Sequence, residues 1–226
     1  MTHKTVFILA SLLSIALAGA AQAGEHSITI GDGPMVEGSG HVVSQTRPVG
    51  GFDAVQTKGS VDLRISVGQP AAVTVEMDDN LQSMIGTEVQ GGTLVIKSTG
   101  SWRADHDPRV SITLPALSAV AIEGSGDAVL KGFNGGELAL RIGGSGDVEA
   151  SGRVDSLAVV EDGSGDAHLG ELKARQAQVR VNGSGDVTVN AAQTLQATVN
   201  GSGDIRYRGN ATVTSRVHGS GSVEKD

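Results

Sequence analysis

A four-residue sequence, Gly-Ser-Gly-Asp, recurs at nearly constant spacing through the second half of this chain. Gly-Ser-Gly begins at Gly124, Gly144, Gly163, Gly183, Gly201 and Gly219, so the repeats are 18–20 residues long. A fixed period of this length is typical of folds in which each repeat buries its apolar face against its neighbours. The repeat therefore constrains the fold more than any other feature of the sequence.

The segments on both sides of each Gly-Ser-Gly alternate between apolar and polar residues, as strands with one buried face do. The residues four positions before each corner are Val120, Leu140, Val159, Val179, Ala197 and Ser215. Those two positions before it are Ile122, Ile142, Glu161, Val181, Val199 and Val217. We therefore predict an all-β fold, a right-handed single-stranded parallel β-helix (a solenoid) with coils of about 18–20 residues.

The corner itself is expected to be a structural turn. Glycine reaches the positive φ values that sharp bends need, and Ser and Asp side chains can bond nearby backbone N–H groups. The residues assigned to this column of turns are Gly124, Gly126, Asp127, Gly144, Gly146, Asp147, Gly163, Gly165, Asp166, Gly183, Gly185, Asp186, Gly201, Gly203 and Asp204.

The aspartates of the corners would form an outward-facing line, because each precedes an inward residue. Adjacent carboxylates about 4.8 Å apart repel by about 1 kcal/mol in water. A hydrogen bond from each aspartate to its own turn recovers about as much. We expect no cofactor, with Ca²⁺ bound by Asp127, Asp147, Asp166, Asp186 and Asp204 as the alternative.

Two positions depart from the repeat. Ser222 replaces the Asp of the last corner, and Glu161 stands where the pattern has Val or Ile. Glu161 is either a buried acid with a raised pKa or is turned outward by a local bulge. We expect the bulge, because the neighbouring outward residue, Val160, is apolar.

Residues 1–23 have the features of a secretory signal peptide. Lys4 precedes an apolar run, and Ala21-Gln22-Ala23 is a small-residue cleavage site. The chain has no cysteine, so it has no disulfide and no lipid-anchored cysteine. We expect an exported periplasmic or extracellular protein that is not a lipoprotein and has no transmembrane segment once the signal is removed.

Residues 24–46 are expected to be poorly ordered, followed by one β domain over 47–226. Within it, 47–118 would form irregular capping coils and 119–226 the regular ones. The capping region contains a polar loop, 98–109, with the chain's one Trp. Either this Trp folds back over the core, or the loop binds a ligand through Trp102, Arg103, Asp105 and His106.

Charge limits the partners. The formal net charge is −8, which argues against nucleic acid as a ligand. An envelope or surface partner, protein or polysaccharide, remains, and the chain could form oligomers.

The chain resembles the bacterial family called putative auto-transporter adhesin, head GIN domain. The resemblance rests on the Gly-Ser-Gly-Asp corners, on Pro48-Val49-Gly50-Gly51-Phe52-Asp53-Ala54-Val55 and on Asp78-Asp79-Asn80-Leu81. It rests also on Tyr207-Arg208-Gly209 together with Gly219-Ser220-Gly221, and it covers residues 47–226. The resemblance implies a β-helix without an established catalytic set.

These observations predict a binding or scaffold module of the cell envelope, adhesion-related and not an enzyme. Two alternatives stay open: a carbohydrate-active enzyme, a polysaccharide lyase or hydrolase built on a β-helix, and a calcium-binding β-solenoid. Gly-Ser-Gly-Asp is not the nucleophile elbow Gly-x-Ser-x-Gly, because Asp stands where the last Gly should be.

Overall fold

The computed structural model describes residues 35–226. The predicted signal peptide and the first part of the predicted poorly ordered segment lie outside the described residues. The described part is all-β, as predicted, apart from one short 3₁₀ helix, η1 (Asp79–Met84).

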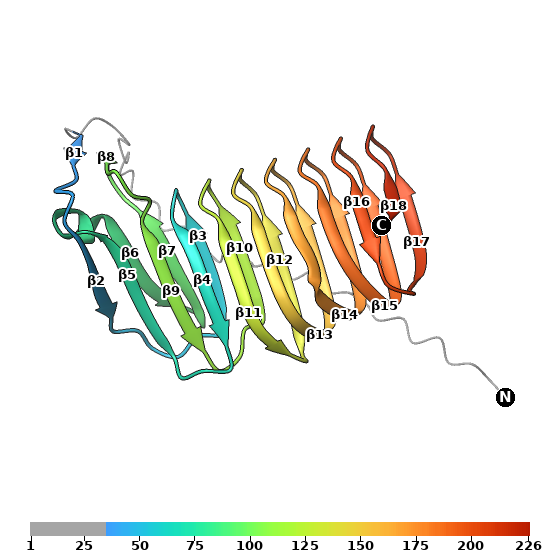
Figure 1. Cartoon of the computed structure of the whole chain (residues 1–226), viewed down its shortest axis with the longest axis horizontal. Coiled ribbons are helices and arrows are strands. Elements are labelled where there is room, and N and C mark those ends of the chain that lie inside the picture. Colours follow the sequence, from blue (N-terminus) through green and yellow to red (C-terminus); the bar gives the residue numbers. More distant parts are fainter. Residues whose placement is uncertain (1–34) are drawn as a thin grey trace, which may run out of the picture. The chain divides into compact units, whose positions relative to one another are not determined.

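The strands follow one another as shown in Figure 1. The first nine are β1 (Val36–Glu37), β2 (Val42–Arg47), β3 (Ala54–Lys58), β4 (Asp62–Val67), β5 (Ala72–Asp78), β6 (Ile85–Gln90), β7 (Thr93–Ser98), β8 (Trp102–Arg103) and β9 (Arg109–Leu114). The others are β10 (Ala119–Glu123), β11 (Ala128–Asn134), β12 (Glu137–Ile142), β13 (Val148–Glu161), β14 (Ala167–Val181), β15 (Val187–Val199), β16 (Ile205–Arg208), β17 (Thr212–Val217) and β18 (Val223–Lys225).

In the repeated region, each strand pairs in parallel with the strand one repeat later. Leu140 lies beside Val159, Val159 beside Val179, and Val179 beside Ala197. These side chains are all buried, so the prediction that this column faces inward is confirmed. Ser215 of the same column is exposed, since β17 pairs with β15 alone among the described strands. We call two strands joined by one Gly-Ser-Gly corner, or by its degenerate copy at residues 59–62, a level.

The first levels do not follow the order of the sequence. β3 pairs in parallel with both β7 and β10, and β4 pairs with both β9 and β11. The β3–β4 level therefore lies between strands that come later in the chain. β9 leads to β10 past this level, through residues 115–118.

Antiparallel strands complete the sheet at its N-terminal end. β5 runs antiparallel to β2 and β9, and β6 runs antiparallel to β7. One 16-stranded sheet results, whose order runs from β2 through β9, β4 and β11 to β13 and returns through β12, β10 and β3 to β7 and β6. Because it doubles back, the sheet is nearly closed and barrel-like around a single apolar core.

The prediction of a right-handed single-stranded parallel β-helix is therefore wrong. A solenoid requires every repeat to pack against its neighbours in sequence. Here the sheet is mixed, and its first levels are interleaved. The repeat pattern could not reveal this, because β5 and β6 lie in the segment without Gly-Ser-Gly-Asp corners and double back through tight turns at Gly68 and at Gly91-Gly92, all with positive φ.

The prediction that residues 24–46 are poorly ordered is also wrong for the part that the structure describes. β1 pairs with β8, and β2 covers the edge of β5. Gln82 of η1 is buried and donates hydrogen bonds to the carbonyl oxygens of Val43 and Met77, at 2.9 and 3.1 Å. These bonds hold β2, β5 and η1 together over the end of the core.

The 3₁₀ helix η1 begins after Asp78, whose side chain makes no capping hydrogen bond. Within residues 35–226, no helix is long and apolar enough to cross a membrane.

Candidate binding surface

The corner glycines are required by contact between levels and not by backbone conformation. None of the glycines of the Gly-Ser-Gly-Asp corners has a positive φ, which corrects the expectation from the sequence. A Cβ at Gly144 would overlap the carbonyl oxygen of Gly124, and one at Gly146 would overlap that of Gly126. The same holds at each later corner, so any side chain would push two levels apart.

This close approach keeps the backbone ladder continuous around the corner. The N–H of Ser145 donates to the carbonyl oxygen of Gly124 at 2.9 Å, and that of Ser164 to Gly144 at 2.9 Å. The later corners repeat this bond, so strands on both sides of a corner stay in register.

The aspartates of the corners form a ladder of their own, which we call the Asp ladder. The carboxylate of each accepts a hydrogen bond from the backbone N–H of the Asp on the next level, and not from its own turn as expected. The bond from Asp166 to the Asp147 carboxylate is 2.8 Å long, as is the bond from Asp186 to Asp166. Asp62 supplies the first carboxylate, at 3.1 Å from the N–H of Asp127, and Ser222 closes the ladder by donating to Asp204 at 2.7 Å.

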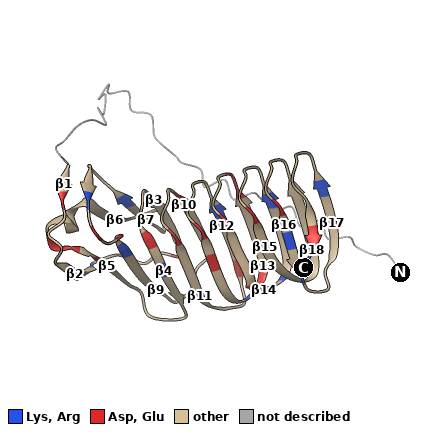
Figure 2. Ribbon diagram, turned by 45° about the horizontal axis from the view of Figure 1, so that its top comes forward, with Lys and Arg blue, Asp and Glu red and all other residues tan. Residues whose placement is uncertain are grey.

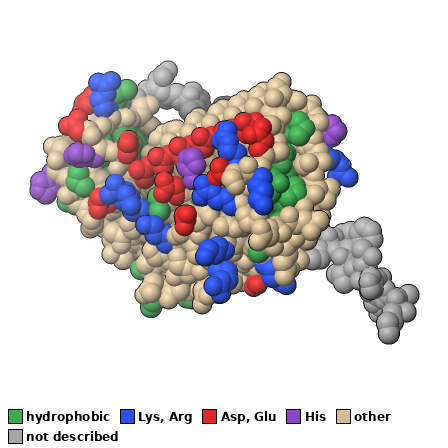
Figure 3. Space-filling view, turned by 45° about the vertical axis from the view of Figure 1, so that its right-hand side comes forward, with side chains coloured by type: hydrophobic (Ala, Val, Ile, Leu, Met, Phe, Trp, Pro, Cys, Tyr) green, Lys and Arg blue, Asp and Glu red, His purple; other side chains and the backbone are tan. Residues whose placement is uncertain are grey.

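The Asp ladder thus accounts for a line of acids without a bound cation. One oxygen of each carboxylate is used by the backbone, and Arg206 pairs with the remaining oxygens of Asp186 and Asp204, at 2.9 and 3.3 Å. Figure 3 shows acidic side chains in a band across one face, with basic side chains beside them. Among residues 35–226, no three His, Cys, Asp or Glu side chains are arranged as a metal site.

Glu161 points into the core, so the predicted outward bulge is wrong. Its side chain is 0% exposed and continues the column of Ile142 and Val181. One carboxylate oxygen accepts the N–H of Gly183 at 3.3 Å, while the other has no hydrogen-bond partner within residues 35–226. Burial raises the pKa of Glu161 to about 7, although the N–H groups of Gly163 and Gly183 partly oppose this.

The loop that contains the only Trp is tied to the fold at its start. Trp102 packs against the core, and its Nε1 donates to Oγ of Ser98 at 3.2 Å. Arg103 accepts the N–H of Gly38 through its carbonyl oxygen at 2.7 Å. Asp105 and His106 are exposed. Of the two readings of the Trp, the structure has the one in which it folds back over the core.

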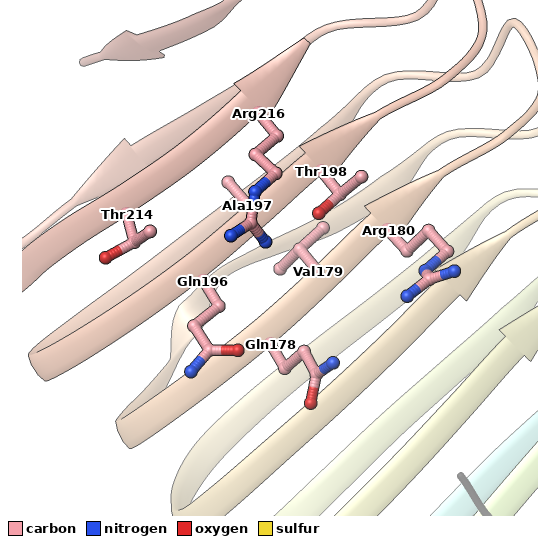
Figure 4. Close-up of a pocket in the computed structure, with 8 residues that line it drawn as sticks. All are labelled: Gln178, Val179, Arg180, Gln196, Ala197, Thr198, Thr214 and Arg216. Atoms are coloured by element: carbon pink, nitrogen blue, oxygen red, sulfur yellow. The ribbon is translucent and has the colours of Figure 1, made fainter. Parts of the chain in front are cut away.

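A polar groove, which the sequence analysis did not single out, lies on the outer face of β14, β15 and β17. Two rows of side chains border it, one formed by Gln178, Gln196 and Thr214 and the other by Arg180, Thr198 and Arg216. Figure 4 shows the side chains of both rows on this face. Thr198 is shorter than the arginines on either side, and the resulting hollow has a volume of about 200 Å³.

The two arginines of the groove have no acidic partner within the described part of the chain. In contrast, Arg141 on an earlier level pairs with Asp162 at 2.6 Å. Asp162 also accepts a hydrogen bond from Asn182 at 2.6 Å, so both of its oxygens are engaged. Figure 2 shows acidic residues on many of the stacked strands and a basic residue near the end of β17. The groove is thus a cationic, hydrogen-bonding strip on a protein of net charge −8.

A second hollow, of about 400 Å³, lies at the opposite bend of the levels. Val67, Leu117 and Phe133 contribute its apolar wall, and Asp53 and Glu137 lie at its border. No Lys or Arg of the described residues lines this second hollow, so it differs in chemistry from the polar groove.

The comparison with known families concerns most of this sheet. The family model described as putative auto-transporter adhesin, head GIN domain, matches residues 51–211. The chain belongs to this family. The match begins just before β3 and ends after β16, so it includes the Asp ladder and most of the polar groove. No curated protein matches the chain significantly.

Solved structures share the fold. A putative adhesin from Bacteroides fragilis is 22% identical, with a TM-score of 0.68 over 84% of this chain and 100% of its own. A putative adhesin from Parabacteroides distasonis is 21% identical, with a TM-score of 0.54 over 85% of this chain and 100% of its own. A putative lipid binding protein from the same species is 23% identical, with a TM-score of 0.51 over 85% of this chain and 99% of its own.

Proposed function

We propose that this chain is an exported, non-catalytic binding module of the bacterial cell surface, which attaches to a polymer through the outer face of its sheet. The observation that carries this proposal is the polar groove, where Gln occurs on two adjacent strands and Arg on the two outer strands. Parallel pairing in register spaces these side chains by about 4.8 Å. A rigid row of evenly spaced groups suits attachment to a polymer, because several weak contacts then form together.

Family membership supports the adhesive role, since the family and two of the similar structures carry the name adhesin. The predicted signal peptide supports export. An enzyme is less well supported: the perturbed acid, Glu161, is fully buried and in no position to meet a polymeric substrate.

A lipid ligand, which the name of one similar structure mentions, finds less support in this chain. The large apolar side chains exposed in the described part are Met35, Val42 and Val217. Val42 lies on β2 and Val217 on β17, at opposite ends of the sheet. They do not form the single apolar patch that a membrane-binding surface needs.

The experiment is co-sedimentation of the purified protein with bacterial cells and with insoluble cell-envelope polysaccharide, while reducing ends are measured in the supernatant. We expect the protein in the pellet and no increase in reducing ends. Turnover that a single carboxylate substitution abolishes would contradict the non-catalytic part of the proposal. A protein that stays in the supernatant with every material would contradict the binding part.

A further inference from the structure

We propose that the polar groove binds an acidic polysaccharide, one that carries uronate carboxylates. This inference rests on the proposed function and specifies its ligand. The site is the strip formed by Gln178, Arg180, Gln196, Thr198 and Arg216. These side chains lie on the outer face of the sheet and are not part of its core.

Charge identifies the anionic part of the ligand. The guanidinium groups of Arg180 and Arg216 lie on one face, within the described residues have no ion pair, and stand on either side of Thr198. A planar guanidinium matches a carboxylate well, because two parallel N–H groups can donate to its two oxygens. The groove is therefore complementary to carboxylates and not to cations.

Spacing identifies the polymeric part. Arg180 and Arg216 are two strands apart, which places their Cα atoms about 10 Å from each other. This separation is comparable to the length of two linked sugar residues, so the two arginines can contact carboxylates on alternate sugars. Gln178, Gln196 and Thr198 lie between and beside them and can exchange hydrogen bonds with sugar hydroxyls.

Other anionic polymers fit less well. Nucleic acid fits less well, because among the described residues the groove offers only two cations and no aromatic side chain on which bases could stack. An anionic membrane would be recognised by apolar side chains beside the cations, whereas the groove is lined mainly by Gln, Thr and Arg. An acidic protein segment could pair with the two arginines, but it has few hydroxyl groups to bond with the side-chain amides of the groove.

The test measures binding of the purified protein to polygalacturonate, alginate and hyaluronate by biolayer interferometry, with fully methyl-esterified polygalacturonate as the uncharged counterpart. We expect binding to at least one acidic polymer, and none to the ester. The double variant R180Q/R216Q should lower the affinity about tenfold or more, since it removes two charge-assisted contacts at each site along the polymer. R64Q/R153Q is the matched control: it also removes two charges, at two exposed arginines outside the groove, and should leave affinity unchanged.

Three results would overturn the inference. They are no binding to any of the acidic polymers, equal binding by R180Q/R216Q, and an equal loss in R64Q/R153Q, which would indicate nonspecific charge attraction. Preferential binding to phosphatidylglycerol vesicles would instead assign the groove to a membrane. Co-sedimentation with cells separates this inference from the proposed function: if the double variant still sediments like the unsubstituted protein, the binding module stands and the groove is not its site.

Discussion

Replacement of Glu161 by Gln should remove a pH dependence of stability that this one buried acid creates. The pKa of Glu161 is about 7 in the folded protein, against an ordinary value of 4.5. Below pH 4.5 the carboxyl is protonated in both the folded and the unfolded state. Between these two values the folded state binds more protons, so the free energy of unfolding falls as the pH rises, and it stays low above pH 7.

The magnitude follows from the same two values. At about 1.4 kcal/mol per pH unit, a pKa near 7 instead of 4.5 corresponds to a loss of about 3 kcal/mol in the free energy of unfolding. Solvent screens the charge of this carboxylate little, because the side chain is 0% exposed. Gln keeps an oxygen that can accept the N–H of Gly183 but carries no charge. The substitution should therefore remove the contribution of residue 161 to the pH dependence of the free energy of unfolding.

The assay is urea unfolding followed by circular dichroism at pH values from 4 to 8. The readout is the difference between the two pH profiles, because the substitution also changes stability by a constant amount. E149Q is the control, since Glu149 lies at an exposed outward position of β13. Parallel profiles for E161Q and the unsubstituted protein between pH 4.5 and 7 would refute the assignment of Glu161 as a buried titrating acid.

Three further predictions concern the corners. D166N should change the free energy of unfolding by less than about 1 kcal/mol, because its amide oxygen can accept the Asp186 N–H, whereas D166A should cost about 1–3 kcal/mol in urea unfolding; equal losses would contradict the Asp ladder. G144A should cost about 3 kcal/mol or prevent folding, while G143A, whose Cβ would only touch at 3.7 Å, should cost far less; similar circular dichroism melting of both variants would contradict close stacking. Millimolar Ca²⁺ should leave the melting temperature unchanged, and a rise that the triple variant D147N/D166N/D186N abolishes would show a cation site.

The residues that face the core could be predicted from the sequence. Alternation around each corner placed Leu140, Val159 and Val179 in one buried column, and the structure agrees. This worked because strand side chains alternate with a period of two, whatever the order of the strands in the sheet. The pattern misassigned Glu161, because the apolar neighbour Val160 suggested a bulge.

The order of the strands could not be predicted in the same way. Residues 59–62 resemble a degenerate corner, and Asp62 does join the Asp ladder. That corner lies directly against residues 124–127, although 65 positions separate Asp62 from Asp127. Periodicity reports which residues are alike, but it does not report where an insertion such as 68–118 folds back.

The chemistry of the corner was only partly accessible. Glycine at the corner is needed for close approach between levels, and Asp bonds the next level. Both facts concern contacts between repeats, which one repeat considered by itself cannot show. The polar groove was missed for a related reason: Arg180 and Arg216 belong to different repeats, and only the parallel register brings them to one face.

The most direct test of the account is a titration of ¹⁵N-labelled protein with an acidic oligosaccharide, such as oligogalacturonate, followed by NMR. Binding in the groove predicts that the largest shift changes occur in the side-chain amides of Gln178 and Gln196 and in the backbone amides of 178–180 and 196–198. These changes should be absent with the methyl-esterified oligosaccharide. Largest changes in the loop 98–109, or no change at any acidic oligosaccharide concentration, would contradict the claim that the outer face of β14, β15 and β17 is the binding surface.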